Sequence, residues 1–413
     1  MTVARPIPTA SHTRGDLRTT GLIGLAHFTS HFLMVAIAPL LPLMKAEFNV
    51  SFTQLGFILS VFFATSGIGQ VAAGMIVDRI GPHRLLLGGV ALQSVSVLLM
   101  GFAPSWLLLL PLAFFAGLGN TVYHPSDLSI LSRRITLARQ GRAFASHSMA
   151  GALGFAVSPL AMGFIGLHWG WRVALIAGGI FGLLSAASLL LNRTWLHADD
   201  FHPHATSESD RTAAPARRLS FFELLRLPVV MFGFAFFLLT AFAGAALMNF
   251  TVSALTEGYG VVLTTATIAI ALLQFGSIGG TLVGGMAADR YGRHYLIASI
   301  GVFGAGVALL PIVYTGLPLA LIMVCLTVSG IFGGLGLPSR DLLIRGAAPR
   351  GNLGKTFGSV YSGLDAGSLI GPLLIGPLLD HNMPQFLFLS AAIAFFLSIF
   401  TVIGIRGPSD QPK

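Results

Sequence analysis

Charged residues are scarce in this chain of 413 residues. Only 9% of them are Asp, Glu, Lys or Arg, whereas 54% are apolar, and the mean hydropathy is +0.82. A water-soluble globule of this length would lack the polar surface that it needs. The composition therefore predicts an integral membrane protein.

Other features are also missing. The single cysteine, Cys325, excludes an internal disulfide framework, and its apolar neighbours in sequence indicate a packing role. The chain has no phosphate-cradling nucleotide loop. It also lacks the Ser-Lys, paired-Asp and His-Glu-x-x-His patterns of intramembrane hydrolases. We therefore expect neither an enzyme nor a cofactor.

Long apolar segments recur along the chain. A segment of about 20 apolar residues can cross the roughly 30 Å of hydrocarbon in a bilayer. Such segments begin near Gly21, Gln54, Leu85, Trp106, Ala143, Val173, Val229, Thr264, Tyr295, Leu317, Thr356 and Phe386. The expected fold is all-α, with six-helix halves at residues 21–191 and 227–405. Residues 1–20, 192–226 and 406–413 are expected to form a tail, a linker and a second tail.

Positive charge is distributed unevenly between the two sides of these spans. Only Lys45 and Arg172 fall in the turns of one side, and the remaining 22 of the 24 Lys and Arg residues fall at the other. Positive residues are retained on the cytoplasmic side of a membrane. We therefore expect a multi-pass protein of the cell inner membrane with both termini in the cytoplasm. The net charge of +9 then reflects topology and not nucleic-acid binding.

The two halves repeat several short motifs. A charged turn at residues 74–84 recurs 211 residues later at residues 285–294, and Pro125-Ser126 recurs as Pro338-Ser339. Further on, Gly141, Phe144, Gly154 and Pro159 match Gly354, Phe357, Gly367 and Pro372. Many secondary transporters are built by such duplication, with the substrate at the interface between the repeats.

The first charged turn has the pattern Gly-x-x-x-Asp-Arg-x-Gly-x-x-Arg. It is carried by Gly74, Asp78, Arg79, Gly81 and Arg84. This turn resembles the signature of the major facilitator superfamily, and the resemblance extends over essentially the whole chain. Residues 119–125 and 141–144, with His27 and Leu41-Pro42, are similar to the fosmidomycin-resistance type of transporter. The resemblance implies a proton-coupled carrier of small molecules whose two halves rock around a central cavity.

In such a mechanism the charged turns form a cytoplasmic gate. The expected gate residues are Asp78, Arg79, Arg84, Asp127, Asp289, Arg290 and Asp341. For Asp127 we favour an ion pair with Arg79, Arg84 or Arg133, and the alternative is that it lines the cavity. A carboxylate near a helix N-terminus is stabilised by the helix dipole and a nearby arginine.

Histidines gather in the first half. His27 and His31 share one helical face, and Asn120, His124 and Asp127 share another. Polar groups at membrane depth cost a few kcal/mol unless they have partners. Pro125 would leave the carbonyl of Thr121 without its helical donor and predicts a kink there. We therefore interpret His124, together with Asn120 and Tyr123, as a cavity residue.

These imidazoles, with His147 on the next helix, have several possible roles. Histidine exchanges protons near its ordinary pKa of about 6.5, so the group suits proton relay as well as anion binding. A metal site is not expected, because a carboxylate or thiolate ligand is not close in sequence. The simpler alternative is that His31 and His147 bind neighbouring helices through hydrogen bonds.

The second half offers one cation and one deep acid. Arg340 occupies the place of Asp127 in the repeat, so it either pairs across the halves or attracts an anionic substrate. Asp365 lies nearest the expected midplane, with Tyr361 on the same face. Intramembrane carboxylates are functional by default, so Asp365 is the leading proton carrier. A structural bond to Tyr361 is the alternative.

We therefore expect a secondary transporter for a small organic anion or a phosphonate-like compound. Short Gly-Pro motifs on helices 5 and 11 resemble an antiporter motif and slightly favour exchange, which is compatible with export. A multidrug exporter of lipophilic cations would need a more acidic, aromatic pocket. That exporter and a non-transporting receptor or scaffold remain the alternatives. The expected partners are substrate, protons and lipid, without nucleic acid, for a monomer.

Overall fold

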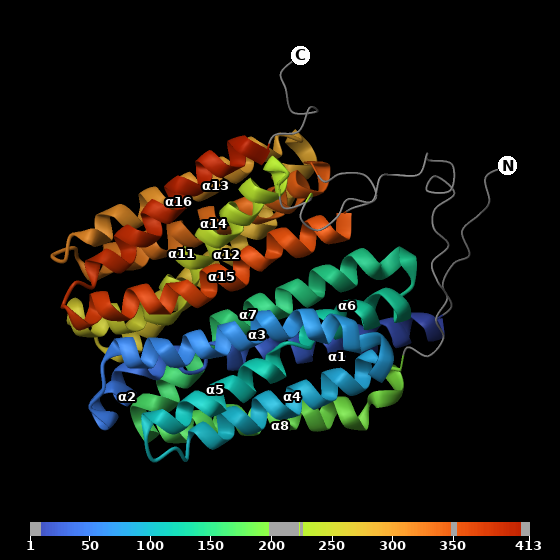
Figure 1. Cartoon of the computed structure of the whole chain (residues 1–413), viewed down its shortest axis with the longest axis horizontal. Coiled ribbons are helices and arrows are strands. Elements are labelled where there is room, and N and C mark those ends of the chain that lie inside the picture. The colour runs from blue at the N-terminus through green and yellow to red at the C-terminus, as the bar shows by residue number, and fades with distance from the viewer. Residues whose placement is uncertain (1–9, 198–222, 224–225, 348–352, 406–413) are drawn as a thin grey trace.

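The computed structural model describes residues 10–197, 223, 226–347 and 353–405. Within these ranges, twelve helices are long and apolar enough to cross a membrane, as the sequence predicts. They form two bundles that lie side by side, one coloured blue to green and the other yellow to red (Figure 1). Most of the expected linker, residues 198–222 and 224–225, lies outside the described residues.

The bundles have matching helix orders. The N-terminal half contains α1 (Ala10–Met34), η1 (Ala38–Leu40), α2 (Leu41–Phe48), α3 (Phe52–Ile80), α4 (Pro82–Met100), α5 (Trp106–Asn120), α6 (Tyr123–Arg134), α7 (Leu137–Trp169), α8 (Trp171–Leu191) and η2 (Arg193–Trp195). The C-terminal half contains α11 (Pro228–Gly258), α12 (Leu263–Tyr291), α13 (His294–Leu309), η3 (Leu310–Val313), α14 (Leu319–Ala347), α15 (Leu353–Asp380) and α16 (Gln385–Ile405). We call the end at which α1 begins and α16 ends the terminal end, and the opposite end the distal end.

Local sequence sets several helix boundaries. Ser51 caps α3 through a reciprocal pair of hydrogen bonds with Gln54, at 3.1 and 2.9 Å. Asn49 ends α2 in the left-handed conformation, which asparagine tolerates well. The turn from α2 into α3 at the distal end is therefore encoded by adjacent polar residues.

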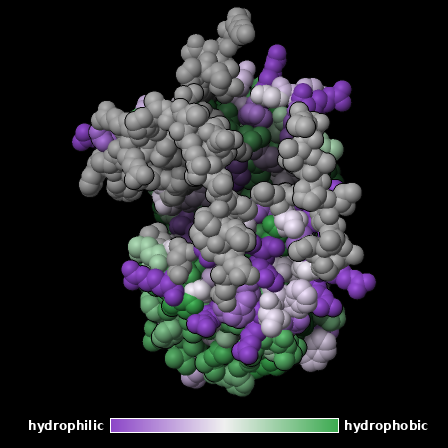
Figure 2. Space-filling model, turned by 90° about the vertical axis from the view of Figure 1, so that its right-hand side faces the viewer, coloured by the Kyte–Doolittle hydropathy of each residue, from purple (hydrophilic) through white to green (hydrophobic). Residues whose placement is uncertain are grey.

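The outer surface is suited to lipid. Large apolar side chains such as Leu184, Leu191 and Phe400 are exposed, and in a bilayer this exposure carries no hydrophobic penalty. Figure 2 looks onto the terminal end, where hydrophilic residues gather, while the lower rim is hydrophobic. The molecule therefore has the polarity pattern of a protein that spans a membrane along its long axis.

The halves meet along two helix pairs, α3 with α15 and α7 with α12. Glycines permit the first contact: a Cβ at Gly56 would lie 2.7 Å from the Pro372 carbonyl oxygen, and one at Gly376 would lie 2.8 Å from that of Phe52. Close backbone approach of this kind is typical of membrane helix interfaces.

One crossing helix is interrupted at a position that the sequence predicts. Residues 121 and 122 separate α5 from α6, so Pro125 falls in the first turn of α6. In a first turn the missing proline N–H costs nothing, because that donor has no intrahelical acceptor. The interruption lies where the kink is expected, and both of its residues keep right-handed helical φ/ψ.

Candidate functional site

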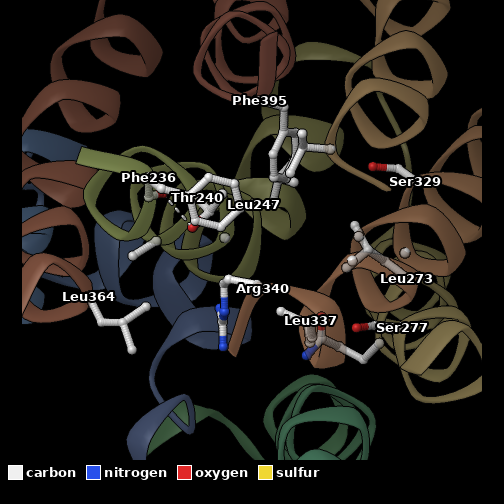
Figure 3. A pocket seen from close by; sticks show the side chains of 17 residues that line it. Phe236, Thr240, Leu247, Leu273, Ser277, Ser329, Leu337, Arg340, Leu364 and Phe395 are labelled. Carbon is white, nitrogen blue, oxygen red and sulfur yellow. Dashed lines mark hydrogen bonds between the residues drawn. The ribbon is translucent and has the colours of Figure 1, made fainter. Parts of the chain in front are cut away.

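A cavity of about 180 Å³ lies within the C-terminal half. Its walls are mostly apolar, and Figure 3 shows Phe236, Leu273, Leu337 and Phe395 around it. Polar atoms come from Thr240, Gln274, Ser277, Ser329 and Arg340. We call this space the C-half cavity. An apolar pocket with a few polar groups is the usual form of a small-molecule site.

A second cavity, of about 480 Å³, lies between the halves. It is lined by α1, α7, α12 and α14, and its polar residues include His31 and Ser148. Gln274, Ser277 and Leu337 line both cavities. We call the second space the inter-half cavity, and its shared wall places it directly beside the C-half cavity.

Arg340 supplies positive charge to the C-half cavity. Its guanidinium lies 4.2 Å from the ring centroid of Phe237, and its Nε donates to Asp341 at 2.9 Å. Tyr361 interacts with both Arg340 and Asp341 and packs on Phe237, with ring centroids 4.6 Å apart. In this structure Asp341 is therefore the partner of Arg340, whereas the sequence placed it in the gate. Arg340 and Asp341 are adjacent on α14, so this ion pair lies within one helix.

Asp365 lies at the seam between the halves. A Cβ at Gly67 of α3 would lie 2.6 Å from the Cβ of Asp365 on α15. The Asp365 side chain is half-buried, and within the described ranges its carboxylate has no hydrogen-bond partner. The alternative of a structural bond to Tyr361 is therefore absent here. Asp365 therefore lies where a change in the charge of its carboxylate would alter the contact between α3 and α15.

The predicted histidines of the first half do come together. The His27 and His147 rings stack with centroids 3.7 Å apart, and His31 and His124 lie 4.3 and 5.2 Å from His27. Asp127 joins them: its Oδ2 lies 3.1 Å from His147 Nε2 and 3.5 Å from His27 Nδ1. We call these five residues the histidine cluster.

The cluster corrects the interpretation of Asp127 as a gate residue. Its carboxylate is fully buried and contacts imidazoles, not Arg79, Arg84 or Arg133. The reason is packing between helices: α6 contacts α1 and α7, which carry His27 and His147. The carboxylate whose absence argued against metal binding is therefore present.

Asn120 and Tyr123 do not line either cavity. Asn120 accepts from Ser30 Oγ and donates to Ser66 Oγ, both at 2.9 Å, and so joins α5 to α1 and α3. Tyr123 is fully buried in an apolar cluster. Their expected cavity roles are wrong in this structure, because both side chains project into the N-terminal bundle.

The charged turns lie at the terminal end. Arg79, Arg84, Asp289 and Arg290 are exposed, and the Asp78 side chain lies outside the described residues. Arg290 lies 5.8 Å from the Tyr291 ring centroid, an interaction within its own turn. Their role as a gate therefore remains a prediction.

Contacts between the halves are strong at the distal end. Asp380 of α15 accepts from Phe52 N at 2.7 Å, Thr53 N at 2.9 Å and Thr53 Oγ1 at 2.6 Å, all at the start of α3. We call this contact the distal latch. Lys45 also donates to Glu257 across the halves at 3.0 Å.

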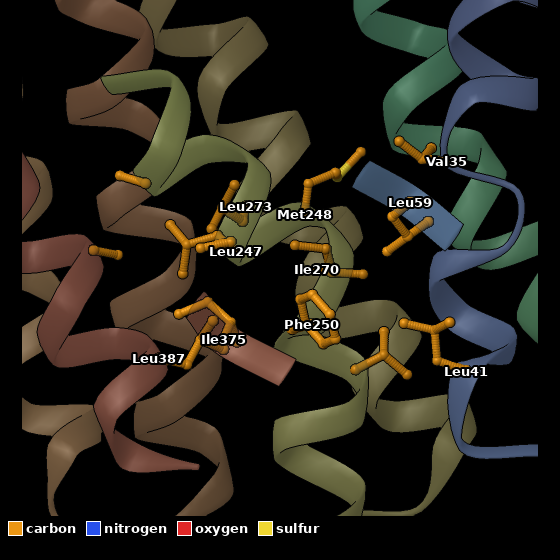
Figure 4. Close-up of a cluster of buried hydrophobic side chains, with 14 of the residues drawn as sticks. Val35, Leu41, Leu59, Leu247, Met248, Phe250, Ile270, Leu273, Ile375 and Leu387 are labelled. Atoms are coloured by element: carbon orange, nitrogen blue, oxygen red, sulfur yellow. The ribbon is translucent and has the colours of Figure 1, made fainter. Parts of the chain in front are cut away.

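An apolar core lies beneath these polar contacts. Figure 4 shows Val35, Leu41 and Leu59 of the N-terminal half facing Met248 and Phe250 of the C-terminal half, all of them buried. Such contacts exclude water, so the distal side is closed in this structure.

Sequence reasoning missed Gln274 and Asp380. Gln274 lines both cavities from the apolar helix α12, where an amide inside a span was the available signal. Asp380 lies at the end of α15, and nothing in the sequence pairs it with residues more than 300 positions away.

Two pseudo-symmetric bundles around a cavity, closed at one end, define a secondary membrane transporter. The sequence matches the Major Facilitator Superfamily over residues 23–260 and 234–413. The chain belongs to this superfamily, so it is a transporter of small molecules and not an enzyme.

Two relatives with named functions are similar to this chain over most of its length. The chain is 21% identical over 421 residues to the Fosmidomycin resistance protein of Escherichia coli, which covers 99% of this chain and 98% of that protein. It is 29% identical over 354 residues to the Gentisate transporter of Corynebacterium glutamicum, covering 82% and 76%.

The fold itself has solved counterparts. A bacterial homologue of the human lysosomal transporter Spinster, in an inward-facing and unoccupied conformation, matches with a TM-score of 0.70 at 18% identity. The match covers 97% of this chain and 100% of that one. This similarity confirms the expected twelve-helix fold.

Proposed function

We propose that this protein is a proton-coupled carrier of small organic anions that works by alternating access across the inner membrane, with both termini in the cytoplasm. The observation that carries the proposal is Arg340, a guanidinium in the wall of an apolar cavity deep in the C-terminal half. A guanidinium in a low-dielectric wall favours carboxylate or phosphonate groups through paired N–H donors.

The electrostatics of the cavities argue against a lipophilic cation. Among the described lining residues, Arg340 and His31 are the titratable ones, and neither cavity has a carboxylate in its wall. Asp341 pairs with Arg340 at 2.9 Å but lies in neither cavity wall, so a cation in these cavities would meet a guanidinium and no carboxylate. Fosmidomycin is an anionic phosphonate and gentisate is an organic acid, so the names of two relatives agree with this preference.

The conformation is consistent with an inward-facing state. The distal latch and the apolar core below it close one end, while the charged turns at the terminal end are exposed. With cytoplasmic termini, the cavity would open toward the cytoplasm. The Gly-x-x-x-Asp-Arg turns would then close the terminal end in the opposite state.

Asp365 is the proposed site of proton coupling. It lies where α15 meets α3, so a change in its charge would alter the contact between the halves. An ionised carboxylate at such a seam favours access to water, whereas its neutral form can be covered. The resemblance to a drug-resistance protein favours export in exchange for protons.

Transport by proteoliposomes tests the proposal. The purified protein would be reconstituted with an imposed pH gradient and assayed with radiolabelled gentisate, fosmidomycin and tetraphenylphosphonium. We expect gradient-driven flux of an anion that Arg340→Ala abolishes and Arg340→Lys partly retains. Arg193→Ala, on an exposed residue outside the membrane helices, is the matched control.

Other outcomes would contradict the proposal. Flux of tetraphenylphosphonium that is insensitive to Arg340→Ala would indicate a multidrug exporter. Anion flux that does not respond to the pH gradient would remove proton coupling. No flux of any compound by folded protein would favour a receptor or scaffold.

A further inference from the structure

Three ligand atoms from three helices converge in the histidine cluster. They are His27 Nδ1 on α1, Asp127 Oδ2 on α6 and His147 Nε2 on α7, and all lie within 4.8 Å of one another. The two distances to Asp127 Oδ2 are 3.5 and 3.1 Å. Around a tetrahedral zinc ion with bonds of about 2.0–2.1 Å, ligand atoms lie about 3.4 Å apart. The side chains are therefore already close to the spacing of a metal site.

Burial makes a cation at this position favourable. Asp127 is fully buried, and the His27 and His147 side chains are 4% and 5% exposed. Within the part of the chain that the structure describes, His27 Nδ1 and Asp127 Oδ1 have no hydrogen-bond partner. A buried carboxylate without a compensating charge is costly. The cluster therefore holds unpartnered lone pairs and a carboxylate at one buried point of the N-terminal half.

A metal ion would engage the three residues more fully than hydrogen bonds do. His147 Nε2 lies within hydrogen-bond distance of Asp127 Oδ2 at 3.1 Å, whereas His27 Nδ1 lies 3.5 Å from the same oxygen, beyond the usual range of a hydrogen bond. A divalent metal ion accepts lone pairs from all three residues at once. The geometry thus favours an ion with several ligands.

The backbone is shaped to bring these side chains together. A Cβ at Gly151 of α7 would lie 2.6 Å from His27 Nε2 and 2.7 Å from His31 Nδ1, so only glycine leaves room for both rings. Asp127 of α6 faces α1 and α7, where it meets His27 and His147. The site thus depends on features that serve no evident purpose in the anion cavity.

The cluster adjoins a cavity through one of its imidazoles. His31 lines the inter-half cavity and lies beside His27, with ring centroids 4.3 Å apart. His124 is exposed and lies 5.2 Å from His27. His31 therefore lies between the inter-half cavity and the three candidate ligands.

From these observations we propose that His27, Asp127 and His147 form a binding site for a divalent transition metal ion of the zinc type. Two imidazole nitrogens and one carboxylate suit Zn²⁺ or Co²⁺, whereas Mg²⁺ and Ca²⁺ prefer ligand sets made of oxygen. The site lies in the N-terminal half, apart from Arg340, so it is independent of the proposed anion site.

Cobalt spectroscopy tests the proposal on the full-length protein. Detergent-purified protein, with its affinity tag removed and treated with EDTA, would be titrated with Co²⁺. We expect intense visible bands of tetrahedral Co²⁺, saturating near one ion per chain and displaced by Zn²⁺. His27→Ala, His147→Ala and Asp127→Asn should each weaken binding at least tenfold.

A second histidine pair provides the matched control. His83 and His197 lie with ring centroids 3.9 Å apart, near the terminal end. The double variant His83→Ala/His197→Ala should leave the cobalt bands unchanged. Loss of the bands in this variant, with retention in the cluster variants, would overturn the proposal.

A measurement on the unmodified protein guards against variants that do not fold. X-ray absorption of the Zn²⁺-loaded wild type should show nitrogen and oxygen neighbours with the outer-shell scattering of two imidazoles. An absence of imidazole scattering, or no retained Zn²⁺ after desalting, would refute the site whatever the variants do. Neither result depends on anion transport.

Discussion

Replacing Asp380 by asparagine should loosen the distal end of the transporter. The carboxylate of Asp380 accepts three hydrogen bonds from Phe52 and Thr53 at the start of α3. It also lies at the positive end of that helix dipole. Asparagine keeps one acceptor oxygen but loses the charge and the second acceptor, so the contact between the halves weakens.

The magnitude follows from these contacts. A hydrogen bond to a charged group contributes about 1.5–3 kcal/mol, and a charge at a helix terminus contributes about 0.3–1 kcal/mol. The site is partly exposed, and asparagine retains some bonding, so we expect a net loss of about 2 kcal/mol. This is roughly a 30-fold change in the ratio of distal-closed to distal-open molecules.

Spin-label distances measure that ratio. Labels at Leu167→Cys and Val262→Cys would report across the distal end, in a background where the only cysteine is replaced by Cys325→Ala. Asp380→Asn should add or enlarge a longer-distance population. The control is Glu47→Gln, which disturbs bonds to Trp171 and Arg172 at the same end but within one half. Equal distance distributions for Asp380→Asn and Glu47→Gln would refute the reasoning.

Three further changes separate the roles of other residues. Asp365→Asn should abolish the dependence of anion flux on the pH gradient. Anion affinity should stay within about threefold of the wild-type value, a margin of about 0.7 kcal/mol. Flux that still responds to the pH gradient in the liposome assay would exclude Asp365 as the proton carrier. Gly151→Ala should weaken Co²⁺ binding at least tenfold because of the close His27 and His31 rings, whereas Gly88→Ala, with open space around it, should not. Asn120→Ala should lower stability by about 1–3 kcal/mol by leaving buried hydroxyls unpaired; an unchanged thermal unfolding temperature would contradict that role.

Much of the fold could be predicted from local sequence. Apolar length alone gives the twelve spans, since each span must satisfy its own backbone hydrogen bonds in lipid. The charged turn at residues 74–84 indicates the superfamily. Even a fine detail, the break before Pro125, follows from one missing N–H.

The site could be predicted only in part, because its geometry depends on packing between helices. The shared face of His27 and His31 follows from their spacing of four residues. The contacts of His147 and Asp127 with His27 depend on how α6 and α7 pack against α1, which sequence spacing does not give. Asp380 and Gln274 depend on distant partners, so no local pattern could place them.

Asp127 and Arg340 show how one duplicated position acquires opposite roles. In the N-terminal half Asp127 is buried among imidazoles of α1 and α7, within its own bundle. In the C-terminal half α14 continues through Pro338, and Arg340 remains in a cavity wall. The proposed metal site therefore lies inside one rocking unit, whereas the inter-half cavity changes shape as the halves move. Asp380→Asn should accordingly leave Co²⁺ affinity unchanged while altering anion affinity, and a parallel change in both would show that the cluster takes part in the rocking itself.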